Sequence, residues 1–356
     1  MKRSIKNIIR SFSFTILFCF LIFPVNAEDH AELSIKELIF EHIGDSYKWN
    51  FFTYKEKDVS LYLPVIVRSE SGSWHIFSSS RLEKGGSYEG FHIAHDGDYK
   101  HKIVEKTGSG AEVRPLDLSI TKNVFSMFVS IIIMMACILP VAIWYKDGRI
   151  KPIGGFPGII EVVILNIHDE VIKPCVGEDY RRYAPYLLTA FFFVLTNNFM
   201  GLIPLFPFGA NLTGNITITF FLAFITFLMI NINGNKHYWK EIFWPDVPTW
   251  LKFPVPMMPI IELWGVLMKP AALTIRLFAN IMAGHSMLLG LTCIIFITAS
   301  MGALANTGMS FLAIIFSIFI SFIEILVSLI QAYVFTLLSS VFIGLSRIKE
   351  EHHEES

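Results

Sequence analysis

The chain has 356 residues, of which 53% are hydrophobic and only 17% are charged, and its formal net charge at pH 7 is −1. This composition is typical of a polytopic membrane protein, it argues against a soluble domain, and the near-zero charge gives no indication of nucleic-acid binding. The sequence contains no Walker phosphate-binding loop, no zinc-type Cys/His spacing and no Gly-x-Ser-x-Gly motif, so it indicates neither a cofactor nor a metal site.

Residues 1–27 have the features of a secretory signal peptide. A basic start with four Lys and Arg residues precedes a short apolar core, and residues 25–27 (Val-Asn-Ala) fit a small-x-small cleavage site. The alternative is an uncleaved membrane anchor. In both cases the segment that follows is expected outside the cytoplasm.

Residues 28–118 are polar and predict a small extracytoplasmic region that is partly β-structure. The segments 59–68 and 73–82 resemble short strands, and Gly85 with Gly86 resembles a turn. Four residues could be imagined as a metal site, but their spacing matches no strong pattern and loop residues are the expected outcome: His92, His95, Asp96 and Asp98. The four cysteines predict no disulfide framework in this region, because the first lies in the signal segment and the others lie in or beside apolar segments: Cys19, Cys137, Cys175 and Cys293.

Five apolar segments predict membrane helices: 123–144, 186–206, 216–232, 257–298 and 309–346. The segment 159–174 is amphipathic, and either lies flat on the membrane or forms a plain surface helix. Loops rich in Lys and Arg alternate with loops that have none. The positive-inside rule therefore predicts residues 28–118 outside the cell membrane and the C-terminus in the cytoplasm.

The last two apolar segments are too long for ordinary membrane spans. Residues 309–346 would form a helix of ~38 residues and ~57 Å, which needs about 60° of tilt to fit a ~30 Å hydrocarbon core. We therefore predict a hairpin of two long, strongly inclined helices. The alternative is a break near Gly290 or Ser310 with ends that protrude from the membrane.

Arg276 lies near the middle of the segment 257–298. Its guanidinium stays charged, and a charge at bilayer depth costs about 3 kcal/mol on insertion scales, so Arg276 is expected to have a function. Asn280 shares its face, and the small residues around them would let a partner helix approach closely: Ala272, Ala279, Ala283 and Gly284. The alternatives are that the small residues pack within the same bundle and that the buried charges only pair to lock helices together.

The companion segment carries one polar stripe, Glu324, Ser328 and Gln331, at i, i+4 and i+7. His285 points away from Arg276 by half a revolution, so it is expected beside Glu324, where the pair either passes protons or forms a structural hydrogen bond. Asn198 either lines the same aqueous cavity or caps a helix break. Glu262 lies close to the face of the helix that carries Arg276, but it is ~20 Å away from Arg276 along the helix axis.

Three motifs together resemble subunit a of the F-type ATP synthases: KPAALTIRLFANIMAGH (269–285), SFIEILVSLIQAYVF (321–335) and NNFMGLIP (197–204). The similarity covers residues 120–348. Together with the residue patterns, the resemblance implies an all-α polytopic membrane domain at 119–348 with about five membrane helices, followed by a cytoplasmic tail at 349–356.

The resemblance also implies a function. Arg276 matches the arginine that faces the carboxylates of the c-ring between two offset half-channels. The residues that match polar residues around the outer half-channel are Asn280, His285, Glu324 and Gln331. Glu262 matches an acidic residue near the inner half-channel, and Asn198 matches a channel-lining asparagine. The order of His285 and Glu324 is reversed relative to the enterobacterial pattern, as in mitochondrial-type relatives, which preserves the chemistry. Gly201 stands where some members carry an acid.

The family further implies a non-catalytic, proton-translocating subunit of the bacterial inner membrane. Its expected partners are the c-ring proteolipids, subunit b of the peripheral stalk, the F1 sector through the complex, and the lipid bilayer. The alternative from another class is a secondary transporter with a buried Arg–carboxylate site. Such a transporter predicts matching halves, and the sequence has no internal repeat.

Overall fold

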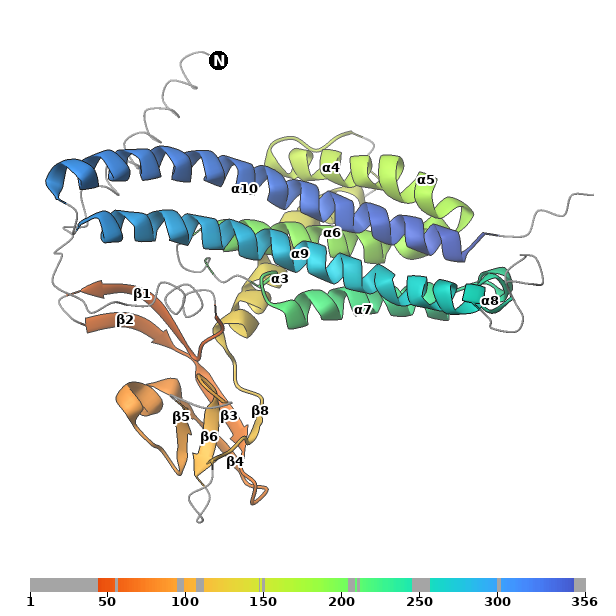
Figure 1. The fold of residues 1–356 in the computed structure, drawn as a ribbon. Coiled ribbons are helices and arrows are strands. Elements are labelled where there is room, and N and C mark those ends of the chain that lie inside the picture. Colours follow the sequence, from red (N-terminus) through yellow and green to blue (C-terminus); the bar gives the residue numbers. More distant parts are fainter. Residues whose placement is uncertain are drawn as a thin grey trace, which may run out of the picture. The chain divides into compact units, whose positions relative to one another are not determined.

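The computed structural model describes residues 44–54, 57–94, 99–106, 112–146, 148, 151–203, 209, 212–244, 257–299 and 302–348 (Figure 1). They belong to one compact unit, residues 39–356. Short strands come first along the chain, and long helices follow from residue 122. The predicted signal peptide and cytoplasmic tail lie outside the described residues.

The part of the chain before residue 118 contains three small antiparallel sheets in its described residues, ordered β1-β2, β4-β3-β8 and β5-β6-β7. The strands in the described part of the chain are β1 (Lys48–Tyr54), β2 (Lys57–Tyr62), β3 (Pro64–Arg68), β4 (Trp74–Ser78), β5 (Phe91–Ile93), β6 (Ile103–Lys106), β7 (Glu112–Val113) and β8 (Leu116–Asp117). Alternate residues of β3 point into a core that includes Val65, Val67 and Phe77. The expectation of short strands is confirmed for 59–68, which divides at Leu63 into β2 and β3. It is confirmed only in part for 73–82, because the strand β4 ends at Ser78 and a 3-10 helix, η1 (Ser79–Gly85), follows.

The four residues considered as a metal site are only partly visible. His92 Nε2 of β5 lies 3.0 Å from Glu112 Oε1 of β7, across the intervening strand β6, while His95, Asp96 and Asp98 lie outside the described residues. Within the described ranges, no three His, Cys, Asp or Glu side chains are grouped so that they could hold a metal ion.

The first membrane helix, α3 (Lys122–Lys146), starts against the strand region. Asp45 Oδ1 accepts a hydrogen bond from the Asn123 backbone N–H at 3.1 Å, which satisfies a donor that the helix itself cannot pair. The rings of Trp49 and Phe125 meet edge to face at 5.8 Å. Nearby, burial raises the pKa of the Tyr47 phenol, which donates to Asp117 Oδ2 at 2.5 Å. These contacts fix the N-terminal end of α3 to residues far away in the sequence.

The helix α3 confirms the span predicted at 123–144 and contains Pro140. The amphipathic segment that follows forms α4 (Phe156–Asn166), a π-helical turn (Ile167–Ile172) and α5 (Lys173–Val176). The apolar side chains of the π-helical turn are buried in the helical core, whereas Ile159 and Val162 of α4 are exposed. One end of this segment therefore packs on the bundle and the other presents an apolar face outward.

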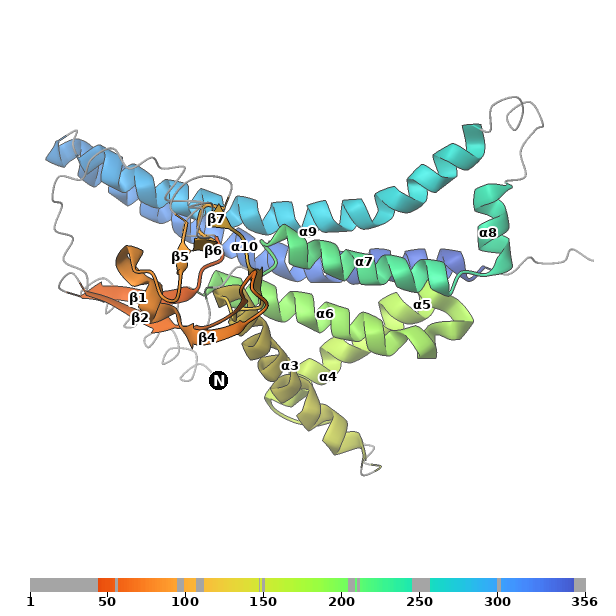
Figure 2. The ribbon, with the colours of Figure 1, turned by 90° about the horizontal axis from the view of Figure 1, so that it is seen from below.

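Two shorter helices form the centre of the bundle, α6 (Tyr180–Leu202) and α7 (Ile216–Ile232). The bounds of α7 are those predicted. The helix α6 begins six residues before the predicted residue 186, because Tyr183 and Ala184 are buried in the helical core and extend its apolar face. A short helix, α8 (Lys236–Phe243), follows α7 at an angle of 101° (Figure 2).

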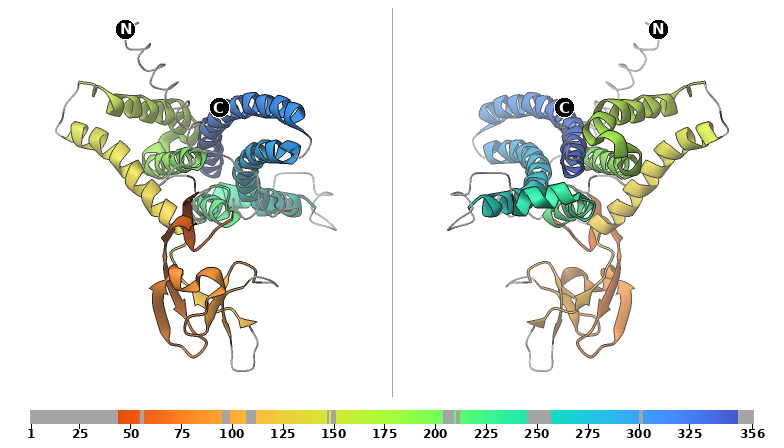
Figure 3. Two further views of the ribbon diagram at one scale, coloured as in Figure 1. Left: turned by 90° about the vertical axis from the view of Figure 1, so that its left-hand side faces the viewer. Right: turned by 90° about the vertical axis from the view of Figure 1, so that its right-hand side faces the viewer.

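The last two helices are continuous, which confirms the predicted hairpin of long helices. They are α9 (Met257–Thr298, 42 residues) and α10 (Ala303–Ser346, 44 residues). The alternative of a break near Gly290 or Ser310 is wrong, because both residues lie inside helix, and α10 starts six residues before the predicted residue 309. Figure 3 looks along the two helices and shows them packed side by side. At ~1.5 Å per residue they are ~63 and ~66 Å long, which again requires about 60° of tilt in a ~30 Å core.

In the described part of the chain, three helices are long and apolar enough to cross a membrane, namely α3, α9 and most of α10. The bent pair of α7 and α8 can be counted as a fourth. The helix α6 has 23 residues but falls outside this set, and it carries Arg181 and Arg182 near its start and two asparagines near its end. The predicted five helices are thus all present, and α6 is the most polar of them.

Candidate functional site

Arg276 lies on an open face of α9. The residue is exposed, and within the described ranges it has no hydrogen bond and no ion pair. Around the helix axis, Ala272, Ala279 and Ala283 lie within about 60° of Arg276, and all three are exposed. The alternative that these alanines pack inside the bundle is therefore wrong, and among the described residues Arg276 does not pair with a carboxylate to lock helices together.

The other side of α9 is buried, mainly against α7 and α10. The buried residues on this part of the helix are Val266, Leu273, Thr274, Leu277 and Ile281. They are turned away from Arg276 by 60° or more, as expected for a helix with one apolar face in the core (~100° per residue). The arginine face is thus left open for another component.

Glu324 of α10 is buried beside His285 of α9. The distance from His285 Nδ1 to Glu324 Oε1 is 4.0 Å, and Glu324 is only 5% exposed. Neither oxygen of Glu324 accepts a hydrogen bond from the residues that the structure describes. The two groups are therefore neighbours, as predicted, but they do not form the direct structural hydrogen bond that was the alternative.

Gly284 makes room for the Glu324 carboxyl group. A β-carbon at Gly284 would lie 2.6 Å from Glu324 Oε1 and 2.9 Å from its carboxyl carbon. Among the small residues predicted to admit a partner helix, this one instead lets α9 and α10 come together around the acid.

The polar stripe of α10 connects α9 with α6. Asn280 Nδ2 donates to Gln331 Oε1 at 2.8 Å, and Asn198 Nδ2 donates to the Ser328 carbonyl at 3.2 Å. Gln331, Ser328 and Asn198 are at most 3% exposed. Because Asn198 binds α10, it does not cap the end of α6. Its Oδ1 and the Ser328 hydroxyl have no partner in the described protein, and such buried polar atoms in proteins are usually satisfied by water.

Glu262 and Lys269 lie toward the start of α9, away from this cluster. Both are partly buried. Lys269 Nζ lies 5.9 Å from the ring centre of Tyr238 and 5.4 Å from that of Phe342. Glu262 precedes Arg276 by 14 residues, so it is about 21 Å away along the helix axis.

The profile of a protein family described as ATP synthase A chain matches residues 124–344. The chain belongs to this family, subunit a of the F-type ATP synthases. A second profile, described as Domain of unknown function (DUF8433), matches residues 38–118. The two matches meet near the start of α3.

Several curated members of the family are similar over the helical part. ATP synthase subunit a of Chlorobium phaeobacteroides is 39% identical over 245 residues, which cover 67% of this chain and 69% of the relative. ATP synthase subunit a 2 of Prosthecochloris aestuarii is 38% identical over 67% of this chain and 72% of its own. The Myxococcus xanthus subunit a is 36% identical over 67% of this chain and 77% of its own. This subunit a family member is therefore a multi-pass membrane component of the Fo sector, and it works in a complex with other subunits.

Sequence reasoning missed three buried polar residues of α10 beyond Gln331. Thr336, Ser339 and Ser340 are fully buried on this helix. At ~100° per residue, Ser339 lies about 80° from Gln331 around the helix axis, whereas Thr336 and Ser340 lie about 140° and 180° away. The periodicity of the polar stripe therefore gives no signal for Thr336 and Ser340.

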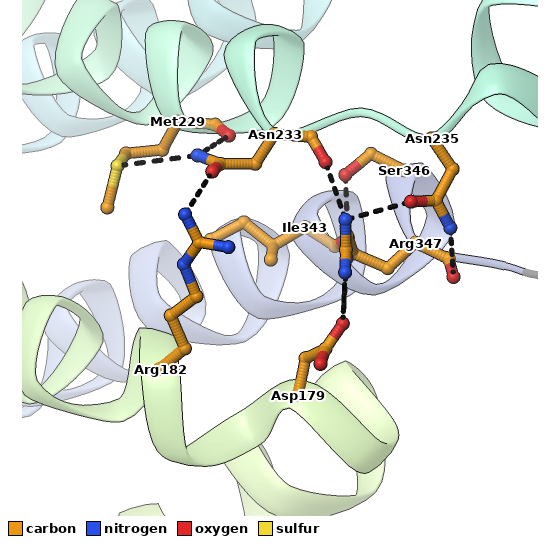
Figure 4. A network of polar contacts seen from close by, with 8 residues as sticks. All are labelled: Asp179, Arg182, Met229, Asn233, Asn235, Ile343, Ser346 and Arg347. Carbon is orange, nitrogen blue, oxygen red and sulfur yellow. Dashed lines mark hydrogen bonds and ion pairs between the residues drawn. The ribbon is translucent and has the colours of Figure 1, made fainter.

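A second group that the sequence analysis did not predict holds the C-terminal ends of α7 and α10 at the start of α6 (Figure 4). The Arg347 guanidinium donates to Asp179 Oδ2 at 2.8 and 2.5 Å, to the Asn233 carbonyl at 3.0 Å and to Asn235 Oδ1 at 2.8 Å. Arg182 donates to Asn233 Oδ1 at 2.9 Å. These bonds join the ends of α7 and α10 to the start of α6, and we call this group the Arg347 clamp.

Gly344 lies one turn before the clamp, where α10 crosses the chain at Cys175. A β-carbon at Gly344 would lie 1.9 Å from the Cys175 carbonyl oxygen. Only glycine permits this close approach of two backbones.

Proposed function

We propose that this chain is the stator side of the Fo proton path, in which Arg276 faces the carboxylates of a rotating c-ring. The single observation that supports this most strongly is the exposed, unpaired guanidinium in the middle of an apolar helix. A cation at membrane depth is stabilised by an opposite charge. A ring of acids that passes Arg276 would supply that charge in the complex.

The chemistry of such a contact follows from electrostatics. A protonated carboxyl group can face lipid, whereas an ionised one cannot. A fixed arginine lowers the pKa of each carboxyl that approaches it and so favours release of its proton. It also keeps protons from passing directly between the two sides. The exposed alanines beside Arg276 let a ring helix approach closely.

We assign the outer half-channel to Asn280, His285, Glu324 and Gln331, together with Asn198. The support is their burial in one connected cluster between α6, α9 and α10. A histidine beside a carboxyl group can exchange protons near neutral pH. We assign the inner half-channel to Glu262, which is on the other side of Arg276 along α9. The 23 residues from Glu262 to His285 span about 35 Å, so the two paths would be offset.

The proposed orientation places the strand region in the periplasm and the C-terminus in the cytoplasm of a bacterium with this chain in its inner membrane. The Arg347 clamp supports it, because the basic loop before α6, the loop after α7 and the end of α10 gather on one side (Figure 4). In this arrangement each proton that crosses gains about 2.3 kcal/mol per 100 mV. The partners would be the c-ring, subunit b of the peripheral stalk and, through the complex, the F1 sector. The chain itself breaks no covalent bond.

The test is ATP-driven proton pumping by vesicles that contain the whole complex. We expect Arg276→Ala to abolish pumping while the complex still assembles. Arg114→Ala is the matched control, because Arg114 is a residue of the strand region, far from α9 in the sequence, and it should pump normally. Coupled pumping by Arg276→Ala at the level of the control would rule out the proposed role.

A further inference from the structure

The short helix α8 lies across the end of α7 and is held there on both sides (Figure 2). Gly234 allows the bend, because a β-carbon there would lie 2.7 Å from the Tyr238 ring. Asn235 at the start of α8 is tied to the end of α10, by its N–H to the Ser346 carbonyl at 3.0 Å and by its Nδ2 to the Arg347 carbonyl at 2.9 Å. The position of α8 is therefore set by the Arg347 clamp.

One edge of α8 is buried, and the next edge presents aromatic rings to the outside. Tyr238 and Ile242 are 7% and 4% exposed and pack in the helical core. Trp239 and Phe243 are 37% and 57% exposed, and their rings stack at 5.9 Å with an angle of 13° between planes. Trp244, directly after the helix, is 58% exposed. These rings form an apolar surface that the described chain leaves uncovered.

Two lysines follow the aromatic edge around the helix. At ~100° per residue, Lys236 lies about 20° beyond Phe243, and Lys240 about 40° further. Lys236 and Lys240 are both exposed. Glu241 projects about 100° away from Lys240, so its charge is on another edge. Arg182, bound to Asn233 just before α8, adds a further positive charge at this end of the bundle.

We propose that α8 binds the headgroup of an anionic phospholipid at the inner membrane surface, with Lys236 and Lys240 on the phosphate and Trp239 and Phe243 against the upper acyl chains. An apolar aromatic edge beside a basic edge is the arrangement of helices that lie in the membrane interface. Basic residues near an anionic surface each add attraction to it. The proposal rests on the orientation given under Proposed function, with this end of the bundle inside.

Free inorganic phosphate has the same charged group, but it offers nothing to the uncovered rings. The exposed aromatic pair and Trp244 therefore favour a lipid over a soluble anion. The bound lipid would fill the angle between α8 and the bilayer and keep α8 beside the start of α9.

The experiment uses the whole complex in phosphatidylcholine vesicles that contain a trace of photoactivatable phosphatidylglycerol. We expect labelling of residues 236–244, found by mass spectrometry of the digested chain. Unlabelled phosphatidylglycerol should reduce the labelling, whereas added phosphatidylcholine or inorganic phosphate should not. Equal competition by phosphatidylcholine would overturn the proposal, and so would competition by inorganic phosphate.

Charge variants give the sharper comparison. Lys236→Gln with Lys240→Gln should lower labelling of α8 several-fold, while Glu241→Gln, which alters a charge on another edge of the same helix, should not lower it. Unchanged labelling in the double lysine variant would overturn the proposal even if the helix is labelled. Arg276→Ala should keep the labelling of α8, so failure of the proton mechanism and failure of lipid binding are seen separately.

Discussion

The carboxyl group of Glu324 occupies the space that a side chain at Gly284 would fill. The two residues belong to different helices, and a β-carbon on Gly284 would come within 2.6 Å of Glu324 Oε1. The contact sets how closely α9 and α10 approach at the level of His285. The position of the buried acid thus depends on the absence of a side chain one residue before its histidine neighbour.

Gly284→Ala should therefore move the Glu324 carboxyl group. We expect ATP-driven pumping by the whole complex to fall by about tenfold or more, since small displacements of a reacting group have large effects on rate. The helix itself should not suffer, because alanine favours helix over glycine by about 1 kcal/mol. Gly290→Ala on the same helix is the control, because a β-carbon added there would meet no neighbouring atom within 4 Å. Equal pumping by the two variants would refute the steric account.

An exchange of the two partners tests whether His285 and Glu324 act as a pair. His285→Glu leaves two acids, and Glu324→His leaves two imidazoles, so each single change should lower pumping strongly. The double exchange restores one of each at the site where the wild-type pair is 4.0 Å apart, and it should pump better than either single variant. A double variant whose loss equals the product of the two single losses would show that the residues act independently.

Gly344→Ala should destabilise the chain rather than impair proton transfer directly. The new β-carbon would meet the Cys175 carbonyl, which is backbone and cannot rotate away. Overpacking of this kind costs about 1–3 kcal/mol. We expect less complex to be recovered and its thermal unfolding to occur at lower temperature. Gly308→Ala is the control, because a β-carbon added there on the same helix would meet no neighbouring atom within 4 Å. Its yield of complex and its unfolding temperature should equal those of the wild type.

Arg347→Ala should loosen the C-terminal ends of the helices more than Arg182→Ala. Arg347 binds Asp179, Asn233 and Asn235, whereas Arg182 has one hydrogen bond, to Asn233. Hydrogen bonds to charged groups contribute about 1.5–3 kcal/mol, less where water competes, and Asp179 is 40% exposed. Amide hydrogen exchange at 233–235 and 344–347 would measure the effect. Equal exchange in the two variants would contradict the importance of the Arg347 clamp.

The length of α9 and α10 could be predicted because apolar residues continue through both segments, with Pro270 the only proline beyond the first turn of either helix. The nearness of His285 and Glu324 followed from helical periodicity alone. In contrast, the contact of Gly284 with Glu324 depends on the distance between two helix axes, which periodicity does not give. The Arg347 clamp joins residues 168 positions apart, and no local pattern marks such a pairing.

In the strand region, too, local structure could be predicted from the sequence but long-range contacts could not. The strands within 59–68 and 73–78 could be predicted from their β-branched and aromatic residues, whereas residues 79–82, expected as strand, belong to a 3-10 helix. The arrangement of the strands in three separate sheets could not be predicted, because strand pairing is decided by contacts between distant segments, such as that of Val67 with Asp117. The capping of α3 by Asp45 is likewise a long-range contact.

The stability of the strand region should depend on pH through Glu89. The hydrogen bond with His75 holds the pKa of Glu89 below its usual range. The ionised form is thus favoured in the folded chain. Its stabilising effect is fully present above the ordinary glutamate pKa of about 4.3 and is lost as the pH falls through the lower folded value. We expect the protection of the β4 amides against hydrogen exchange to decrease between about pH 5 and pH 3. The measurement is made on β4 because His75 lies on this strand.

Glu89→Gln should remove this pH dependence, because its amide does not titrate. The comparison is made between wild type and variant at each pH, so that the intrinsic effect of pH on exchange cancels. Glu70→Gln is the control, since Glu70 is exposed on the turn between β3 and β4 and its carboxylate has no described partner. It should keep the wild-type dependence. If Glu89→Gln lost protection over the same pH range as wild type, another group of the strand region would be responsible.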